Sequence, residues 1–384
     1  MKITPYSLTS ALDGHVAQVI AAQGGWIGFD AFMALALYTP GLGYYANDSV
    51  KFGAMPYAVQ AGMPVPGSDF VTAPEMTPLF GQTLAAQVAQ ALQVTRSGEV
   101  WEFGAGSGAL ALQLLETLGE QVERYTIVDL SGALRARQQQ TLQKFGGKVR
   151  WVSELPAAMQ GVVVGNEVLD AMPVKLLARV QGVWHERGVA VRPCGQPGDG
   201  LAEPDQRLVW QDRETELRPP VGMDGPHDYV TEIHLQGESF IRTLADRLTA
   251  GAAFFIDYGF PEHEYYHPQR HMGTVMCHRA HQSDSDPLAE VGLKDITAHV
   301  NFTGIALAAQ EAGWGVLGYC TQARFLMNCG LVSRMEQSAL AARVQAQRLI
   351  MEHEMGELFK VIGLYKGEPW DAIGFAVGDR THTL

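Results

Sequence analysis

The chain has 384 residues, 47% hydrophobic and 18% charged, with a formal net charge of −13. This length and apolar content predict a large core, in two domains or in one elaborated domain. The acidic balance, without a long run of lysine and arginine, argues against nucleic-acid binding and suits a basic partner. No apolar run reaches the length of a membrane span, so we expect no membrane insertion.

Cysteine spacing and the start of the chain suggest a compartment. The four cysteines, at positions 194, 277, 320 and 329, show no C-x-x-C spacing, which argues against a zinc site or a disulfide framework. The first arginine is Arg96, whereas mitochondrial leaders are rich in arginine, and residues 1–5 lack a signal-peptide core. We therefore expect a cytoplasmic protein of a bacterium.

Residues 1–95 are expected to form an N-terminal helical or cap region. Helical segments come first, and a stretch rich in glycine and proline follows at 40–67. A turn at 71–78 then opens a long helix predicted over 79–92.

A glycine-rich turn is the most informative feature of the chain. An apolar run that includes Glu102 is followed by Gly104, Gly106 and Gly108, and an apolar helical segment follows at 109–118. This order predicts a strand, a tight turn and the start of a helix. Without Cβ atoms, the glycines let a ligand approach the backbone closely. Such turns at the carboxyl edge of a parallel sheet bind nucleotide-like ligands.

Two cofactors fit this turn. Gly104, Gly106 and Ala109 match the G-x-G-x-x-G/A fingerprint of NAD-binding domains. Gly104, Gly106 and Gly108 match the G-x-G-x-G turn of methyltransferases that use S-adenosylmethionine (SAM). The next predicted strand, 124–130, carries Asp129 about 25 residues after the first glycine, near the spacing at which an acid holds ribose hydroxyls. Both interpretations predict this acid.

Later strands favour the methyltransferase. A third strand is predicted at 148–152, and Glu154 just after it is a candidate for the adenine amino group or, equally, a solvated or helix-capping acid. The fourth strand, 161–165, is wholly apolar, as expected for burial on both faces. Asn166, Glu167 and Asp170 follow it directly. In methyltransferases this loop faces the transferred methyl group, whereas a dehydrogenase has no need of such a cluster. A helix cap would explain one of these residues but not all three.

The remaining strands complete a recognisable sheet. A fifth strand is predicted at 252–259, and the last two, at 314–321 and 359–366, have too few residues after them for a crossover helix. We therefore predict an α/β fold with a Rossmann-like class I methyltransferase sheet of seven strands, whose last pair is antiparallel, beside an N-terminal helical region and a β-rich insertion. Its parts after residue 95 are the first half of the SAM-binding domain at 96–173, the β-rich insertion in the substrate region at 174–235, and the second half at 236–384 with an insertion at 260–300.

The insertion at 260–300 contains five histidines, at positions 263, 267, 271, 278 and 281. Three of them are spaced by four residues, which on a helix would align them as metal ligands. Pro261 and Pro268 oppose a continuous helix here. We therefore expect structural or substrate-loop histidines and no metal.

Several separated motifs together resemble the MidA-like, complex I assembly-factor methyltransferases, a branch of class I SAM-dependent enzymes. They are S-D-F-V-T-A-P-E at 68–75 with F-G at 80–81, E-F-G-A-G-S-G at 102–108, N-E-x-x-D-A-x-P-V at 166–174, I-D-Y-G at 256–259, Y-Y-H-P-Q-R at 265–270 with G-T at 273–274, D-x-T-A-H-V-N-F at 295–302, and T-Q-x-x-F-L at 321–326. The resemblance covers nearly the whole chain. Ala105 departs from the proline common in the glycine turn, and residues 168–169 depart from the aromatic residues common after the fourth strand.

The resemblance implies SAM as cofactor and, from its mitochondrial member, methylation of a protein arginine in a respiratory-complex subunit. Carboxylates are needed to hold a guanidinium in a fork geometry, and a base must accept its proton. The candidate sites are catalytic Glu167, Asp170 and Asn166; cofactor-binding Glu102, Gly104, Gly106, Gly108, Asp129, Glu154 and Asn166; and substrate-binding Glu75, Glu232, Tyr258, His267 and Arg270. A small-molecule methyltransferase, a SAM-binding assembly factor without turnover, and a homodimer stay open.

Overall fold

The structure, a computed structural model, describes residues 5–47, 59–60, 63–64, 72–129, 131–193, 206–222 and 227–384. The chain divides into two compact units. Unit 1 comprises residues 1–49, 171–236 and 263–298, and unit 2 comprises 50–170, 237–262 and 299–384. Residues 68–71 of the first motif and Cys194 lie outside the described residues, as does most of the glycine- and proline-rich stretch.

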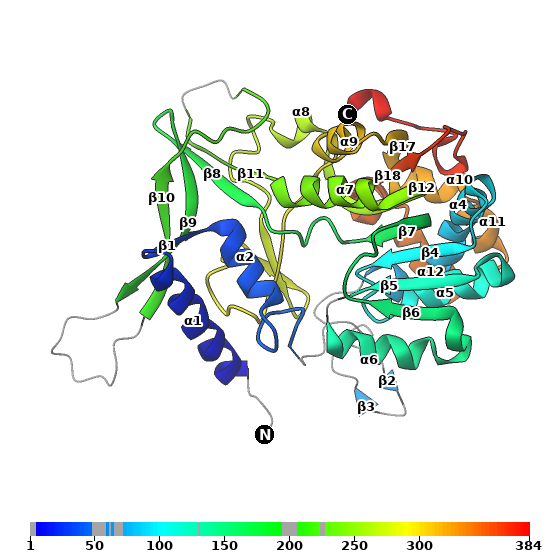
Figure 1. Cartoon of the computed structure of the whole chain (residues 1–384), viewed down its shortest axis with the longest axis horizontal. Coiled ribbons are helices and arrows are strands. Elements are labelled where there is room, and N and C mark those ends of the chain that lie inside the picture. Colours follow the sequence, from blue (N-terminus) through cyan, green and yellow to red (C-terminus); the bar gives the residue numbers. More distant parts are fainter. Residues whose placement is uncertain are drawn as a thin grey trace. The chain divides into compact units, whose positions relative to one another are not determined.

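Unit 2 contains the predicted sheet (Figure 1). Its strands run in the order β17-β18-β12-β7-β4-β5-β6, and β16 pairs with β12. β6, β5, β4, β7 and β12 are parallel neighbours, while β18 is antiparallel to both β12 and β17. The class I methyltransferase sheet with an antiparallel last pair is therefore confirmed. The strand bounds are β4 Glu99–Phe103, β5 Arg124–Val128, β6 Val149–Val152, β7 Met159–Asn166, β12 Leu248–Phe260, β16 Val300–Asn301, β17 Gly315–Thr321 and β18 Phe359–Lys366.

The helices of unit 2 connect and cover these strands. They are α3 Ala73–Met76, α4 Leu79–Thr95, α5 Ala109–Leu118, η1 Gly119–Gln121, α6 Gly132–Thr141, η2 Gln143–Lys148, α7 Leu235–Arg247 (which begins in unit 1), α9 Phe302–Glu311, α10 Gln322–Asn328, α11 Leu331–Glu336, α12 Leu340–Arg348, η3 Glu352–Gly356, η4 Ile373–Phe375 and η5 Thr381–Thr383. The short strands β2 Val59–Gln60 and β3 Met63–Pro64 pair with each other.

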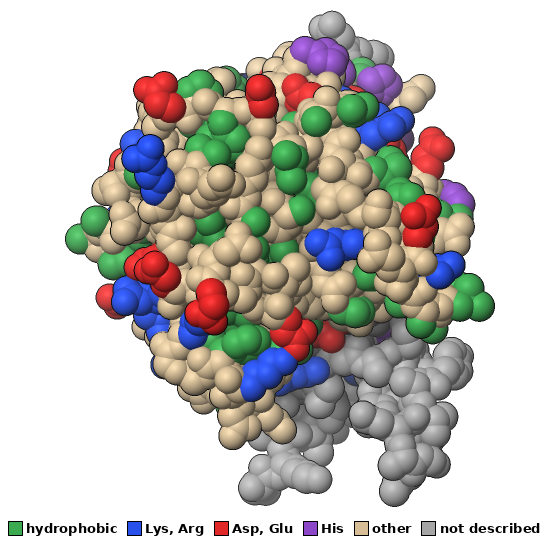
Figure 2. Space-filling model, turned by 90° about the vertical axis from the view of Figure 1, so that its right-hand side faces the viewer, with side chains coloured by type: hydrophobic (Ala, Val, Ile, Leu, Met, Phe, Trp, Pro, Cys, Tyr) green, Lys and Arg blue, Asp and Glu red, His purple; other side chains and the backbone are tan. Residues whose placement is uncertain are grey.

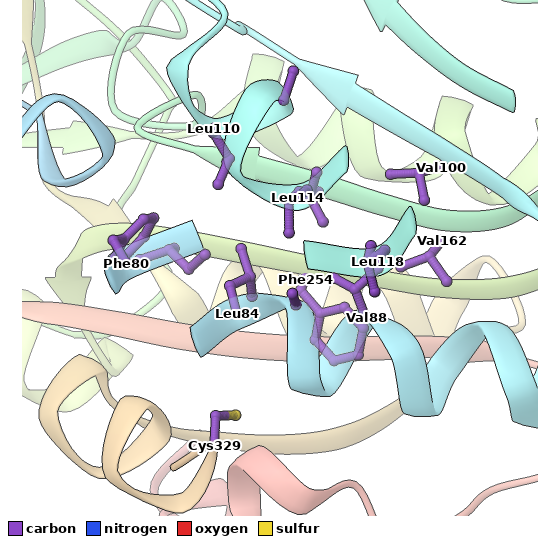
Figure 3. Packing of buried hydrophobic residues seen from close by; sticks show 14 of the residues in the cluster. Phe80, Leu84, Val88, Val100, Leu110, Leu114, Leu118, Val162, Phe254 and Cys329 are labelled. Carbon is purple, nitrogen blue, oxygen red and sulfur yellow. The ribbon is translucent and has the colours of Figure 1, made fainter. Parts of the chain in front are cut away.

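The core of unit 2 lies between α4, α5 and one face of the sheet. Leu84 of α4 and Leu114 of α5 point toward Val162 and Phe254 of the strands (Figure 3), and all four are fully buried. Each such side chain contributes about 1.5–3 kcal/mol through burial. On the opposite face, Phe240 of α7 packs against Phe103 and Phe255. Because both faces are covered, the carboxyl ends of the strands remain as the place for a ligand.

Unit 1 is built on a second sheet, with the order β1-β9-β8-β11 and with β10 paired to β9. Gln181 and Gly182, with φ of 50° and 84°, form the two-residue turn between β8 and β9, a hairpin that the sequence analysis did not foresee. Trp26–Gly28 (β1) was likewise unforeseen within a region expected to be helical. The elements are α1 Pro5–Ala22, β1, α2 Phe29–Tyr38, β8 Lys175–Val180, β9 Val183–Pro193, β10 Gln206–Glu214, β11 Tyr229–Ile233, α8 Glu262–Tyr265 (which begins in unit 2), β13 Met276–Arg279, β14 Gln282–Asp284 and β15 Asp295–Thr297.

Three further features bear on whether the chain binds nucleic acid, a membrane or a metal ion. Lysine and arginine side chains are interspersed with acidic ones on the face shown in Figure 2. Among the described residues, no helix is both long and apolar enough to span a bilayer. The described part of the chain also contains no group of three or more histidine, cysteine, aspartate or glutamate residues that could hold a metal ion. In the histidine-rich insertion, the helix α8 follows Pro261 and is only 4 residues long, as the prolines there predict.

Candidate active site

The glycine turn has the backbone conformation that its sequence predicts. β4 ends at Phe103, and Gly104, Gly106 and Gly108 all have positive φ, of 62°, 51° and 85°. L-residues rarely adopt this left-handed region, so each of these positions favours glycine. A Cβ atom at Gly104 would also lie 3.1 Å from Val168 Cγ2, in the loop after β7. The cofactor turn and the predicted methyl-transfer loop are therefore neighbours.

Gln138 of α6 supports the turn, a role that the sequence analysis missed. Its buried side chain donates from Nε2 to the Gly106 carbonyl oxygen at 3.0 Å and to the Asp129 carboxylate at 2.7 Å, and its Oε1 accepts from Trp151 Nε1 at 3.0 Å. One amide thus links the turn to the ends of β5 and β6. A single glutamine in a polar helix carries no sequence signal for this role.

Replacing Gln138 with alanine should raise the Kd for the cofactor about tenfold, because the turn and Asp129 each lose a hydrogen bond of about 1 kcal/mol. Calorimetric titration with SAM measures this change. Gln139→Ala is the matched control, since Gln139 is the exposed neighbour on the same helix. Equal Kd values for Gln138→Ala and the parent would show that this linkage does not support the turn.

Other predicted cofactor residues lie around the same strand ends. Asp129 follows β5, is half-buried, and accepts from the Ser131 backbone N–H at 2.8 Å. Glu154 lies in the bend after β6 and is exposed. The Glu75 carboxylate accepts a hydrogen bond from the Ser107 hydroxyl. Glu75, predicted to bind substrate, is thus beside the cofactor turn.

The last residue of β7 and the loop after it bring the three catalytic candidates together. Asn166 is 9% exposed, and its Nδ2 donates to Glu167 Oε1 at 2.9 Å. Its Oδ1 is buried without a hydrogen-bond partner among the described residues, so an acceptor is available for a ligand. Glu167 has a φ of 55°, which is unusual for a residue with a side chain. Asp170 is 4% exposed and accepts from the Tyr258 hydroxyl.

Asp257, near the end of β12, holds this loop. It is 1% exposed, and its Oδ2 accepts from the backbone N–H groups of Val168 (3.1 Å), Leu169 (2.9 Å) and Asp170 (3.2 Å). Burial, with repulsion from Asp170 and Glu167, holds the pKa of Asp257 well above its ordinary value. Asp257 belongs to the I-D-Y-G motif at 256–259, but the motif alone indicates no role for it.

Aromatic rings adjoin the carboxylates. The Tyr258 ring meets His299 at a centroid distance of 5.2 Å and Phe359 at 5.4 Å, edge to face in both cases. The Tyr258 hydroxyl also donates to Asp170, so this tyrosine lies beside that carboxyl group, within the same unit as Glu167. Taken together, acidic and aromatic side chains gather at the ends of β7 and β12, next to the glycine turn.

Comparison with known families decides between the two cofactors. A family described as "Putative S-adenosyl-L-methionine-dependent methyltransferase" matches residues 83–320, more than half of the chain. The chain belongs to this family of methyltransferases. The NAD alternative is therefore set aside, and the cofactor is SAM.

The relatives of this methyltransferase agree with that assignment. A crystal structure of a Burkholderia thailandensis protein bound to S-adenosyl-homocysteine (SAH) is 45% identical, with a TM-score of 0.89, and the match covers 99% of this chain and 98% of that one. The mitochondrial protein arginine methyltransferase NDUFAF7 of Danio rerio is 27% identical over 401 residues, covering 92% of this chain and 86% of that protein. Its Drosophila melanogaster homolog is 26% identical over 430 residues, covering 98% and 92%.

Glu102 of the methyltransferase is the acid before the glycine turn, and it is buried. It is 2% exposed and accepts from the Tyr125 hydroxyl at 2.7 Å. Burial raises its pKa from 4.5 to about 8, the Tyr125 hydrogen bond opposes this rise, and the charge of Asp129 adds to it. A cationic ligand nearby would favour the ionised form.

This pKa predicts how stability depends on pH. The pKa of Glu102 is higher in the folded protein than in the unfolded chain. Its contribution to the free energy of unfolding is therefore complete below about pH 4.5 and is lost as the pH rises toward about 8. Glu102→Gln keeps an acceptor for Tyr125 but does not ionise. We expect its Tm to match the parent at about pH 5 and to exceed it at about pH 9. A constant Tm difference across this range would contradict the protonated state.

The remaining three substrate candidates lie in unit 1 of the methyltransferase. Glu232 is fully buried; its Oε1 accepts from the Thr274 N–H at 2.6 Å, and its Oε2 accepts from the Tyr265 hydroxyl at 2.8 Å. This geometry favours an anchoring role for Glu232 over direct contact with substrate. The segment that it anchors carries His267, which is exposed, and Arg270, whose Nε donates to the Glu264 carbonyl oxygen at 3.2 Å.

Proposed function

We propose that this methyltransferase transfers a methyl group from SAM to the guanidino group of an arginine in a protein. The observation that carries the proposal is the cluster of Asn166, Glu167 and Asp170 with Tyr258, at the carboxyl edge of β7 and β12. A guanidinium is a planar cation with several N–H donors, and carboxylates and an amide oxygen are its natural acceptors. The relatives named as protein arginine methyltransferases support the same substrate class.

We propose that Gly104, Gly106, Gly108 and Asp129 hold the cofactor, with Glu102 and Glu154 beside them. The positive φ angles leave the turn open to close approach, which suits a nucleoside with an amino-acid tail. The buried Oδ1 of Asn166, which has no hydrogen-bond partner in the part of the chain that the structure describes, provides an acceptor near the cofactor turn. When bound, SAM supplies an activated methyl group on a sulfonium centre.

The residues of the chain orient the acceptor group and supply a base. Methyl transfer requires the acceptor nitrogen in line with the bond that breaks, so holding the guanidinium is the main task. Glu167 and Asp170 supply negative charge for this, and Glu167, which is half-buried, is our candidate to accept the proton. Tyr258 fixes Asp170 through its hydroxyl, and its ring offers a face on which a guanidinium stacks.

The proposal is tested by mass spectrometry of the proteome of the source organism, with and without the gene. Methylarginine in a defined protein, lost on deletion and restored by the parent gene but not by Glu167→Gln, is the expected result. A change confined to small molecules would favour the small-molecule alternative. Loss of a protein complex without any change in methylation would favour a SAM-binding assembly factor.

For location and partner, we propose a bacterial cytoplasmic enzyme that binds a protein with an exposed arginine. The net charge of −13 suits such a basic segment. The 45% identity to a protein of Burkholderia thailandensis supports a bacterial setting.

A further inference from the structure

We propose that Asp257 is a positioning residue for methyl transfer, whose carboxyl group sets the backbone of the loop that carries Glu167 and Asp170. The inference rests on the proposed function, since it takes this loop as the place of the reaction. Asp257 lies on β12, about 90 residues further along the chain than the loop that it binds. Its contacts are made to backbone atoms and therefore do not depend on the loop's side chains.

The contacts of Asp257 are concentrated on one loop. Oδ2 accepts from three consecutive N–H groups, those of Val168, Leu169 and Asp170, at 2.9–3.2 Å. Oδ1 accepts from the Tyr258 N–H at 3.0 Å. Three successive N–H groups thus converge on one oxygen atom, which a side chain of the protein itself supplies. The carboxylate thus compensates donors that strand pairing leaves over where β7 ends.

The loop needs such a constraint because it begins in an unfavourable conformation. Glu167 has a φ of 55°, and its N–H donates to the Ile256 carbonyl oxygen at 2.9 Å. Ile256 therefore binds the loop at Glu167, and Asp257 binds it at the three residues that follow. Left-handed residues outside glycine persist where surrounding contacts enforce them, and they cluster at functional sites. We infer that this enforcement directs the Glu167 side chain.

Asp257 also places a third acid beside the two that face substrate. Asp170 and Glu167 both act on it electrostatically, and it is more deeply buried than either. Its two side-chain oxygens accept from four backbone N–H groups, whereas an apolar residue would leave those N–H groups unsatisfied. The role of Asp257 is therefore to hold the loop, while Glu167 and Asp170 contact the acceptor.

The test compares Asp257→Asn, Asp257→Ala and the parent in three measurements. They are single-turnover transfer from labelled SAM to proteins of a strain that lacks the gene, the Kd for SAM, and hydrogen exchange at the amides of residues 168–170. Asparagine keeps one oxygen acceptor, so we expect transfer about 10-fold slower for Asn and about 100-fold slower for Ala. The Kd should stay within threefold, and exchange at 168–170 should quicken in the same order. Asp379→Asn is the control, because Asp379 also accepts from backbone N–H groups, those of Tyr319 and Thr381, away from this loop.

Transfer by Asp257→Asn and Asp257→Ala at the parent rate would overturn the inference. So would slow transfer with unchanged exchange at 168–170, or with a Kd raised in proportion, because either would indicate a general structural role. If the parent itself transfers no methyl group, the proposed function fails. The inference is then tested by hydrogen exchange alone. Protection of the amides of residues 168–170 in the Asp257 variants equal to that in the parent would overturn it.

Discussion

Glu167→Gln should lower the rate of methyl transfer by roughly 10²-fold or more while the Kd for SAM changes only a few-fold. Glutamine keeps the shape of the side chain and an acceptor for the Asn166 amide, which lies 2.9 Å from Glu167 Oε1. It removes the charge that attracts a guanidinium and the base that accepts its proton. The cofactor should be held mainly by the glycine turn and Asp129, which this substitution does not touch.

A matched control separates this effect from the loss of one negative charge anywhere on the protein. Glu123 is exposed and immediately precedes β5, at the amino ends of the parallel strands and thus at the opposite edge of the sheet from the loop. Glu123→Gln should transfer methyl groups at the parent rate. Transfer by Glu167→Gln at the parent rate would show instead that this acid is structural, and the guanidinium-clamp hypothesis would fail.

Gly106→Val should abolish SAM binding while the methyltransferase stays folded. A β-branched residue is strongly disfavoured at the φ of 51° that Gly106 adopts, and its side chain would occupy space needed by the ligand. Because the turn lies at the rim of the sheet, the core of α4, α5 and the strands remains in place. Calorimetry measures binding, and circular dichroism with thermal unfolding monitors the fold.

Gly146 offers an unusually close control for this variant. It has the same φ of 51° and nothing within 4 Å of an added Cβ atom. Gly146→Val should therefore also strain the backbone at a positive φ while binding SAM like the parent. If Gly106→Val also binds SAM with the parent's Kd, the turn has only a structural role.

Local patterns were sufficient to predict the sheet and the carboxyl ends of its strands. Apolar runs at 161–165 and 252–259 correspond to β7 and β12. Asn166 is the last residue of β7, and Glu167 and Asp170 follow it. The parallel order places the glycine turn beside them, so the predicted cofactor and catalytic residues of unit 2 share one edge. Their roles stay predictions, as does the four-part division of the chain.

Long-range partners were beyond such patterns. Asp257 binds a loop that ends 87 residues earlier in the chain, and Gln138 lies 32 residues from Gly106. Neither carries a spacing signal, because the contacts exist only once the strands and helices pack. Glu232 is a different case. The sequence predicted that this acid binds substrate, yet it is fully buried and its carboxylate accepts from the backbone of the segment that it anchors.

The central claim is tested most directly by identifying the atom that receives the methyl group. Purified enzyme and methyl-labelled SAM are incubated with proteins from a strain that lacks the gene, and the labelled protein is hydrolysed to amino acids. We predict label in methylarginine, absent with Gly106→Val and strongly reduced with Glu167→Gln. Label in another amino acid or only in small molecules, or no label although SAM binds, would contradict the central claim.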